Sequence, residues 1–168
     1  MKHVFYAFAL VAFLWAGIAS PAAAAKMDFP TGAAVGFSFD LPDGWTTHND
    51  DANKTLVVRT PGETAAVMIL TVIDDKQETG SLEDVAKAAL EVAKAAPYTK
   101  EEDTNISGVP GKAFLSTMSS NGVDFNLTMS IFKIGSTYLS ATEATQVTMT
   151  EEQHNQLATL GLAINGGQ

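Results

Sequence analysis

The sequence predicts an α+β fold in which most of the chain forms an antiparallel sheet. Three observations lead to this prediction. Segments with apolar residues at alternate positions recur along the chain, the dipeptide Asn121-Gly122 joins two of them, and two other segments repeat apolar residues at helical spacing. The 168-residue chain is long enough to bury one hydrophobic core, so we expect a single domain over residues 34–168.

Residues 1–25 have the features of a cleaved secretory signal peptide. Lys2 supplies a positive start, residues 4–18 form an unbroken apolar run, and an A-x-A cleavage pattern ends at Ala25. The run is shorter than the roughly 20 residues that a membrane-spanning helix needs. The sequence contains no cysteine, which excludes a lipidated N-terminal cysteine and a disulfide framework. These features predict an exported, soluble protein of the bacterial periplasm.

Residues 26–33 are expected to form a short flexible leader, and the first strand follows it. In residues 34–41 the apolar side chains Val35, Phe37, Phe39 and Leu41 alternate with small or polar ones, which is typical of a half-buried strand. Leu41-Pro42-Asp43-Gly44 matches a tight turn with proline at its second position. Trp45 is expected to begin the returning strand and to anchor it in the core.

The next two predicted strands are separated by Pro61-Gly62, a strong turn signal. The first covers Thr55 to Thr60 and follows a polar loop. The second covers residues 65–73 and is apolar on both of its faces. That pattern is typical of a strand that is covered on both sides.

Two helices are predicted from their caps and their apolar spacing. Ser81, with Asp84 three residues later, forms a capping box, and apolar residues then recur at helical spacing until Pro97. A second box begins at Thr150 with Gln153, and a helix from there would end at Asn165-Gly166. The apolar stripe of this second helix would consist of Leu157, Leu160, Gly161 and Ile164.

The segment between the helices is predicted to be a three-stranded meander. A two-residue turn at Asn121-Gly122 places Ser120 opposite Val123, and the same register places Phe114 opposite Met129 on an apolar face. A three-residue loop over residues 133–135 would bring Leu139 beside Met129 and Tyr138 beside Ser130. The other face is polar and is our candidate for partner binding, with an ordinary solvated sheet face as the alternative. Its residues are Thr117, Asn126, Thr128, Ser130 and Tyr138.

Residues suited to catalysis or metal binding are scarce. His48 and His154 are the only histidines after residue 25, too few for a zinc site without several carboxylates. Residues 36–40 lack the second glycine of the G-x-S-x-G nucleophile motif. Ser130 and Lys133 match S-x-x-K, but in a strand their side chains point to opposite faces. We therefore predict no catalytic residue, no cofactor and no metal site.

The acidic residues are more numerous than the basic ones. The formal net charge of −9 makes nucleic acid and anionic lipid surfaces poor partners, because like charges repel. The acidic pairs, including Glu101-Glu102 with Asp103, lack the spacing of a calcium-binding loop. Glu151-Glu152 would favour the start of the second helix. The other acidic pairs are expected to lie in solvated loops.

The order of these elements and three short motifs resemble the PsbP-like superfamily. The motifs are F-x-F-x-x-P-x-G-W at residues 37–45, S-L-E at residues 81–83, and G-x-P-G at residues 108–111. The superfamily includes the extrinsic P protein of photosystem II and DcrB-like bacterial envelope proteins. The resemblance implies an α/β/α sandwich, with a mostly antiparallel twisted sheet of about six or seven strands and two main helices. It also implies non-enzymatic work, in which the domain binds or stabilises protein partners.

The function expected from these observations is that of a soluble periplasmic accessory protein that recognises a protein partner in the cell envelope. Two other functions stay open. One is an immunity protein that guards the periplasm against a secreted toxin, because an acidic surface can dock on a basic partner. The other is a hydrolase with a carboxylate site that no sequence motif reveals.

Overall fold

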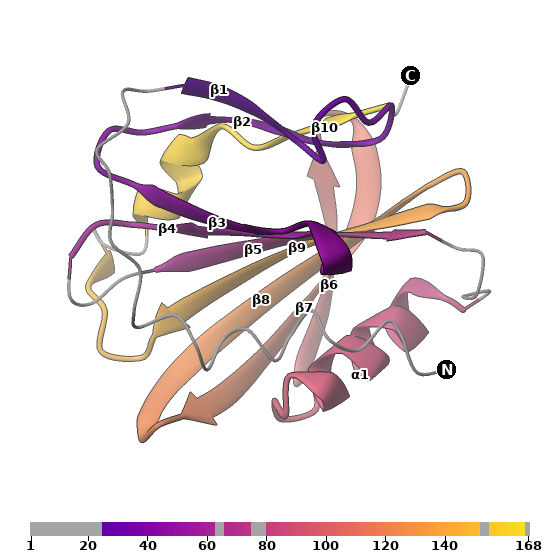
Figure 1. Ribbon diagram of the computed structural model, residues 1–168. Coiled ribbons are helices and arrows are strands. Elements are labelled where there is room, and N and C mark those ends of the chain that lie inside the picture. Colours follow the sequence, from indigo (N-terminus) through magenta and orange to yellow (C-terminus); the bar gives the residue numbers. More distant parts are fainter. Residues whose placement is uncertain (1–24, 63–65, 75–79, 152–154, 167–168) are drawn as a thin grey trace.

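Two antiparallel sheets dominate the computed structural model, which describes residues 25–62, 66–74, 80–151 and 155–166 (Figure 1). The large sheet has the strand order β3-β4-β5-β9-β8-β7-β6, and the small sheet has the order β1-β2-β10. The strands of the large sheet are β3 (Thr46–Asp50), β4 (Thr55–Arg59), β5 (Val67–Asp74), β6 (Lys100–Ile106), β7 (Val109–Ser120), β8 (Val123–Ile134) and β9 (Thr137–Gln146). Those of the small sheet are β1 (Ala25–Phe29), β2 (Gly36–Leu41) and β10 (Ala163–Asn165).

The helical elements that lie wholly within the described ranges are α1 (Leu82–Val92) and the short 3-10 helices η2 (Asp51–Asn53) and η3 (Gln156–Leu160). None of these helices is long and apolar enough to cross a membrane, a statement that covers only the described residues. The predicted α+β class and the mostly antiparallel sheet are confirmed. The predicted signal peptide lies outside the described residues, apart from Ala25.

The large sheet has two buried faces that pack against different elements. On one face, which we call the helix face, α1 packs against β7 and β8, and Phe114, Met129 and Ile131 are fully buried. On the other face, the small-sheet face, the small sheet and η3 lie over the large sheet (Figure 1). Phe132 and Leu139 of the large sheet are buried in one cluster with residues of these covering elements. The second covering layer is therefore a small sheet with a 3-10 turn, whereas a main helix was predicted there.

Glu151 and Asn155 are helical, but from Gln156 on the predicted second helix is replaced by η3 and β10. Leu157 and Leu160 are buried in η3, and Ile164 is buried in β10, so these apolar positions do serve the core. Gly161 has a φ of 57° and ends η3, after which residues 163–165 pair with β2. Backbone pairing with β2 therefore decides the element type. Gln153 of the predicted capping box lies outside the described residues.

Helix α1 begins as predicted and ends earlier. The Ser81 hydroxyl accepts a hydrogen bond from the Asp84 amide at 3.2 Å, and the Asp84 carboxylate accepts one from the Ser81 amide at 3.1 Å. The helix ends at Val92, not at Pro97, because Lys94 adopts a φ of 54°. The Ala95 amide then donates to the Leu90 carbonyl at 3.0 Å, which is the helix-ending pattern usually associated with glycine.

The N-terminal region differs from the prediction in two respects. Residues 26–33 were predicted to be a flexible leader, but residues 26–29 belong to strand β1, which pairs with β2, and Phe29 is buried. The turn is shifted by one residue, because the Trp45 amide donates to the Pro42 carbonyl at 3.2 Å and Gly44 takes the positive φ of 80°. This turn leads from the small sheet to the large one, so β2 and β3 are not a hairpin pair. The prediction that Trp45 is buried is confirmed.

The first hairpin of the meander has the predicted register, and the second does not. Ser120 pairs with Val123 and Phe114 with Met129, as expected from Asn121-Gly122. In the second hairpin Ile134 pairs with Thr137, so the turn contains two residues rather than three. Tyr138 consequently lies opposite Lys133, not Ser130. A register shift of an odd number of residues moves a side chain to the other face of the sheet.

Candidate functional site

A polar patch occupies the part of the small-sheet face that the small sheet leaves uncovered. It lies on β7, β8 and β9, which run on beyond the covered residues Phe132 and Leu139. We call it the open patch. Its polar residues are Thr117, Asn126, Thr128, Ser130 and Glu143, and half-buried Leu115 lies among them opposite Thr128.

The register of β7, β8 and β9 brings these side chains together. Thr117 lies directly opposite Asn126, and Thr128 lies directly opposite Glu143. Because side chains alternate between faces, Ser130 and Asn126 share the face of Thr128. Thr117 and Asn126 are exposed, and the other three are half-buried. Four of the five residues predicted from the sequence therefore form one surface.

Hydrogen-bonding capacity remains unused at these four positions. Among the described residues, the side chains of Thr117, Asn126, Thr128 and Ser130 make no hydrogen bond with protein groups. Asparagine and the hydroxyl residues both donate and accept, so the patch can satisfy either kind of partner group. The backbone beneath them is held by strands on both sides, since β7 and β8 are interior strands of the large sheet. The backbone of the patch is therefore held in place by its neighbouring strands, and its four side chains have donors and acceptors to offer to a partner.

Glu143 belongs to this patch but was not recognised from the sequence. The error follows from the second hairpin, because the predicted three-residue loop placed Leu139 rather than Thr142 beside Met129. In the observed register the strand partners of Glu143 are Thr128 and Met68. The patch thus contains one carboxylate beside its hydroxyl and amide groups.

Tyr138, the fifth predicted residue, lies on the helix face and is fully buried. Its hydroxyl donates to the Gly80 carbonyl at 2.6 Å and accepts from the Lys133 ammonium at 2.8 Å. The Lys133 ammonium also lies 4.5 Å from the centre of the tyrosine ring, within the range of a cation–π contact. Tyr138 therefore ties the β8–β9 turn to the residue before the Ser81 cap of α1. Its role is structural.

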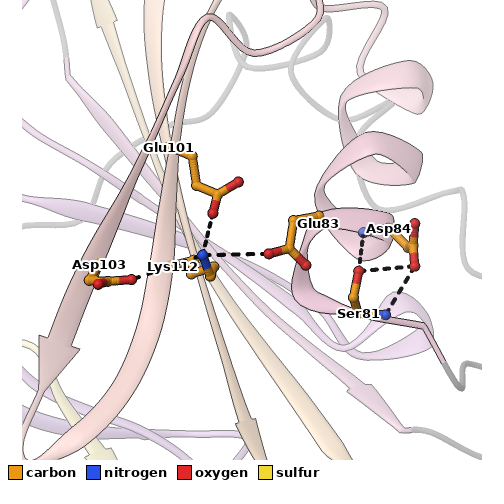
Figure 2. A network of polar contacts seen from close by, with 6 residues as sticks. All are labelled: Ser81, Glu83, Asp84, Glu101, Asp103 and Lys112. Carbon is orange, nitrogen blue, oxygen red and sulfur yellow. Dashed lines mark hydrogen bonds and ion pairs between the residues drawn. The ribbon is translucent and has the colours of Figure 1, made fainter.

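A second polar cluster surrounds Lys112 beside the edge strand β6 (Figure 2). The Lys112 ammonium contacts Glu101 directly, and it lies 3.5 Å from a carboxylate oxygen of Glu83 and 3.9 Å from one of Asp103. The hydrogen bond with Glu101 raises the pKa of Lys112. Residues 101–103 were expected in a solvated loop, but they form part of β6 and face this lysine or the solvent.

The pKa values of the nearby helix carboxylates are shifted downward. Glu83 has a lowered pKa because its own backbone amide, followed by the Ser81 hydroxyl, donates to the carboxylate. The pKa of Asp84 is lowered by the backbone amide and then the hydroxyl of Ser81. Both groups stay ionised in moderately acidic solution, so the negative charge at the start of α1 is maintained there.

Solved structures share this arrangement of elements. Neither a family model nor a curated protein matches the chain. The solution structure of cyanobacterial PsbP (CyanoP) from Synechocystis sp. PCC 6803 matches with a TM-score of 0.57 and 11% identity, over 89% of this chain and 98% of CyanoP. The chain has a PsbP-like fold. LpqN, which is involved in cell envelope biogenesis of Mycobacterium tuberculosis, matches with a TM-score of 0.55 and 12% identity, over 85% of this chain and 91% of LpqN.

Within this PsbP-like fold, the motif residues that resembled catalytic groups lie in strands. Ser38 is buried in β2, and its hydroxyl donates to the Asn165 side chain at 3.2 Å. Ser130 lies in the open patch, whereas Lys133 lies on the helix face with Tyr138. His48 is exposed on β3, and His154 is outside the described residues. In the part of the chain that the structure describes, no group of three histidine or acidic residues converges to hold a metal ion.

Proposed function

We propose that this protein is a soluble periplasmic accessory protein without catalytic activity, and that it recognises a protein partner of the cell envelope through the open patch. The observation that carries the proposal is the set of four uncommitted polar side chains on two neighbouring strands, Thr117, Asn126, Thr128 and Ser130. Protein interfaces carry about one hydrogen bond per 100–200 Å² of buried area, so unused donors and acceptors on one surface can contribute to such an interface.

Three further features support the proposal. The signal-like features of residues 1–25 favour export, and the net charge of −9 disfavours binding to nucleic acid and anionic membranes. The serine and lysine of the S-x-x-K match lie on opposite faces of β8, so they cannot exchange a proton. LpqN, a protein involved in cell envelope biogenesis, has a fold similar to that of this chain.

Affinity capture from native periplasm, followed by quantitative mass spectrometry, tests the proposal. We expect Thr128→Lys to lower the recovery of the specific partner by about tenfold or more, because binding would desolvate a new charge at the centre of the patch. Thr128 is only half-buried, so a lysine side chain there can extend into solvent and the variant should fold. Ser136→Lys places the same charge on the exposed β8–β9 turn and should leave capture unchanged.

Tyr138→Phe tests whether partner binding involves the open patch alone or also Tyr138, the predicted residue that lies on the helix face. It removes only a buried hydroxyl from the helix face, so capture should match the wild type once the variant is shown to be folded. Equal recovery by wild type and Thr128→Lys would contradict the proposal. Turnover in a broad esterase, phosphatase and glycosidase screen that disappears in Glu143→Gln would favour a hydrolase instead.

A further inference from the structure

The edge strand β6 has pairing capacity on one side. It pairs with β7 along its whole length, from Lys100 opposite Leu115 to Ile106 opposite Val109. In the described ranges no strand pairs with its other side, since β6 ends the order of the large sheet. The outward backbone N–H and C=O groups of an edge strand form a template on which another extended chain can pair. The far end of the large sheet is therefore a possible site of strand addition.

Acidic side chains of β6 lie on both faces of the large sheet at this edge. Glu101 and Asp103 share the helix face with Lys112, to which Glu83 of α1 also turns (Figure 2). Glu102 lies on the small-sheet face and pairs with Lys100. All three acidic residues of β6 are exposed. Four carboxylates thus share two lysines, which leaves the edge acidic.

We propose that β6 is a docking edge for an extended, basic segment of a partner protein, which adds to the large sheet as a further strand. Main-chain hydrogen bonds would supply affinity, and alternate side chains of the segment would supply specificity. A lysine or arginine on one face would meet Glu101 and Asp103, and one on the other face would meet Glu102. Charge complementarity on both faces therefore selects a basic strand.

A second copy of this chain is a poor occupant of the same edge. Antiparallel pairing of two β6 strands centred on Glu102 would place Glu102 opposite the same residue of the other copy, and Glu101 opposite Asp103 of the other copy. Like charges directly opposite each other destabilise a strand pair, and the net charge of −9 on each chain adds to the repulsion. The other edge, β3, has Thr47, His48 and Asn49 as its exposed residues and carries no comparable charge. The acidic edge thus disfavours self-association and favours a basic partner.

This inference does not depend on the open patch, and its test keeps the two apart. The probe is a synthetic ten-residue peptide with alternating lysine and valine, added to the exported protein purified from periplasm and followed by amide hydrogen exchange. Strand addition should slow the exchange of outward β6 amides by about tenfold or more, because these groups become hydrogen-bonded. A peptide with glutamate in place of lysine should give no protection.

A basic peptide with alternate N-methylated backbone amides separates strand pairing from simple charge attraction. It keeps the charges but loses hydrogen bonds, so it should leave the β6 amides unprotected. Protection by the N-methylated peptide equal to that by the unmodified one would overturn the proposal. Protection at β3 rather than β6 would also overturn it, as would equal protection by the glutamate peptide.

Variants of the protein complete the test. Asp103→Lys should weaken binding of the lysine peptide by about tenfold, because it removes an attraction and adds a repulsion. Glu91→Lys makes the same charge change on the exposed surface of α1 and should leave binding within about twofold. Thr128→Lys alters the open patch and should leave strand addition intact, so failure of one proposal is distinguishable from failure of the other.

Discussion

The open patch and the covered part of the small-sheet face beside it share strands β7, β8 and β9 and differ in what covers them. In the covered part, Phe132 and Leu139 are fully buried beneath the small sheet and η3. In the open patch, Thr128 and Asn126 of the same strand β8 project from the same face and remain half-buried or exposed. The change from apolar to polar occurs within one strand, at the point where the covering layer ends. Burial here depends on the extent of the small sheet rather than on strand alternation alone.

The largest expected effect compares two residues of β8. Phe132→Ala should lower the free energy of unfolding by about 3–5 kcal/mol, because it leaves a cavity in the core. Thr128→Ala lies four residues away on the same face and should change the free energy of unfolding by about 0.5 kcal/mol or less. Urea denaturation of both variants gives the comparison. Similar losses in the two variants would contradict the division into a covered and an open part.

A middle-sized loss of stability is expected from a change at Gly111 of β7, which lies opposite Phe132 of β8. A Cβ atom there would lie 2.5 Å from the Ile131 carbonyl oxygen and 2.5 Å from Cδ1 of Phe132. Gly111→Ala should therefore destabilise the protein by about 1–3 kcal/mol through overpacking. Thr117→Ala, in the open part of the same strand, serves as the matched control. Thermal unfolding that leaves Gly111→Ala as stable as this control would show that the covered part can relax around an extra methyl group.

The smallest effect concerns the start of α1 on the helix face. Ser81→Ala removes the cap and should cost about 1 kcal/mol near neutral pH. Because the pKa of Asp84 is lowered in the folded protein, the stability that this carboxylate contributes is present above its ordinary pKa. That contribution is lost as the pH falls through the lowered value. The difference between wild type and Ser81→Ala in urea denaturation should therefore shrink in strong acid, and a difference independent of pH would argue against the reciprocal cap.

The two hairpins of the meander show how far local sequence can specify a sheet. Asn121-Gly122 adopts positive φ values of 52° and 78° at its two residues, which is the geometry of a two-residue turn and sets the β7–β8 register. Gly135 is compatible with loops of two or three residues, so the sequence leaves the β8–β9 register open. The observed two-residue turn moves Tyr138 to the helix face and brings Glu143 to the open patch. One local ambiguity thus accounts for both errors in the candidate site.

The C-terminal segment shows a different limit. Its apolar residues Leu157, Leu160 and Ile164 were recognised as core residues, and all three are buried. Their spacing is compatible with a helix, yet residues 163–165 are a strand because β2 offers them backbone partners. The spacing of apolar residues predicts which side chains are buried. It does not show whether a strand far away in the sequence has an edge with which the segment can pair.

By itself, the sequence determined the features that depend on neighbouring residues: the cap at Ser81, the turn at Asn121-Gly122 and the burial of Phe37, Phe39 and Trp45. Tertiary structure decided which part of the large sheet is covered, on which face Tyr138 lies, and that residues 101–103 form an acidic edge. The physical reason is that caps and tight turns arise from interactions over a few residues. Which sheet face is covered and which strand lies at a sheet edge depend on contacts between segments far apart in the chain, such as the pairing of β2 with β10.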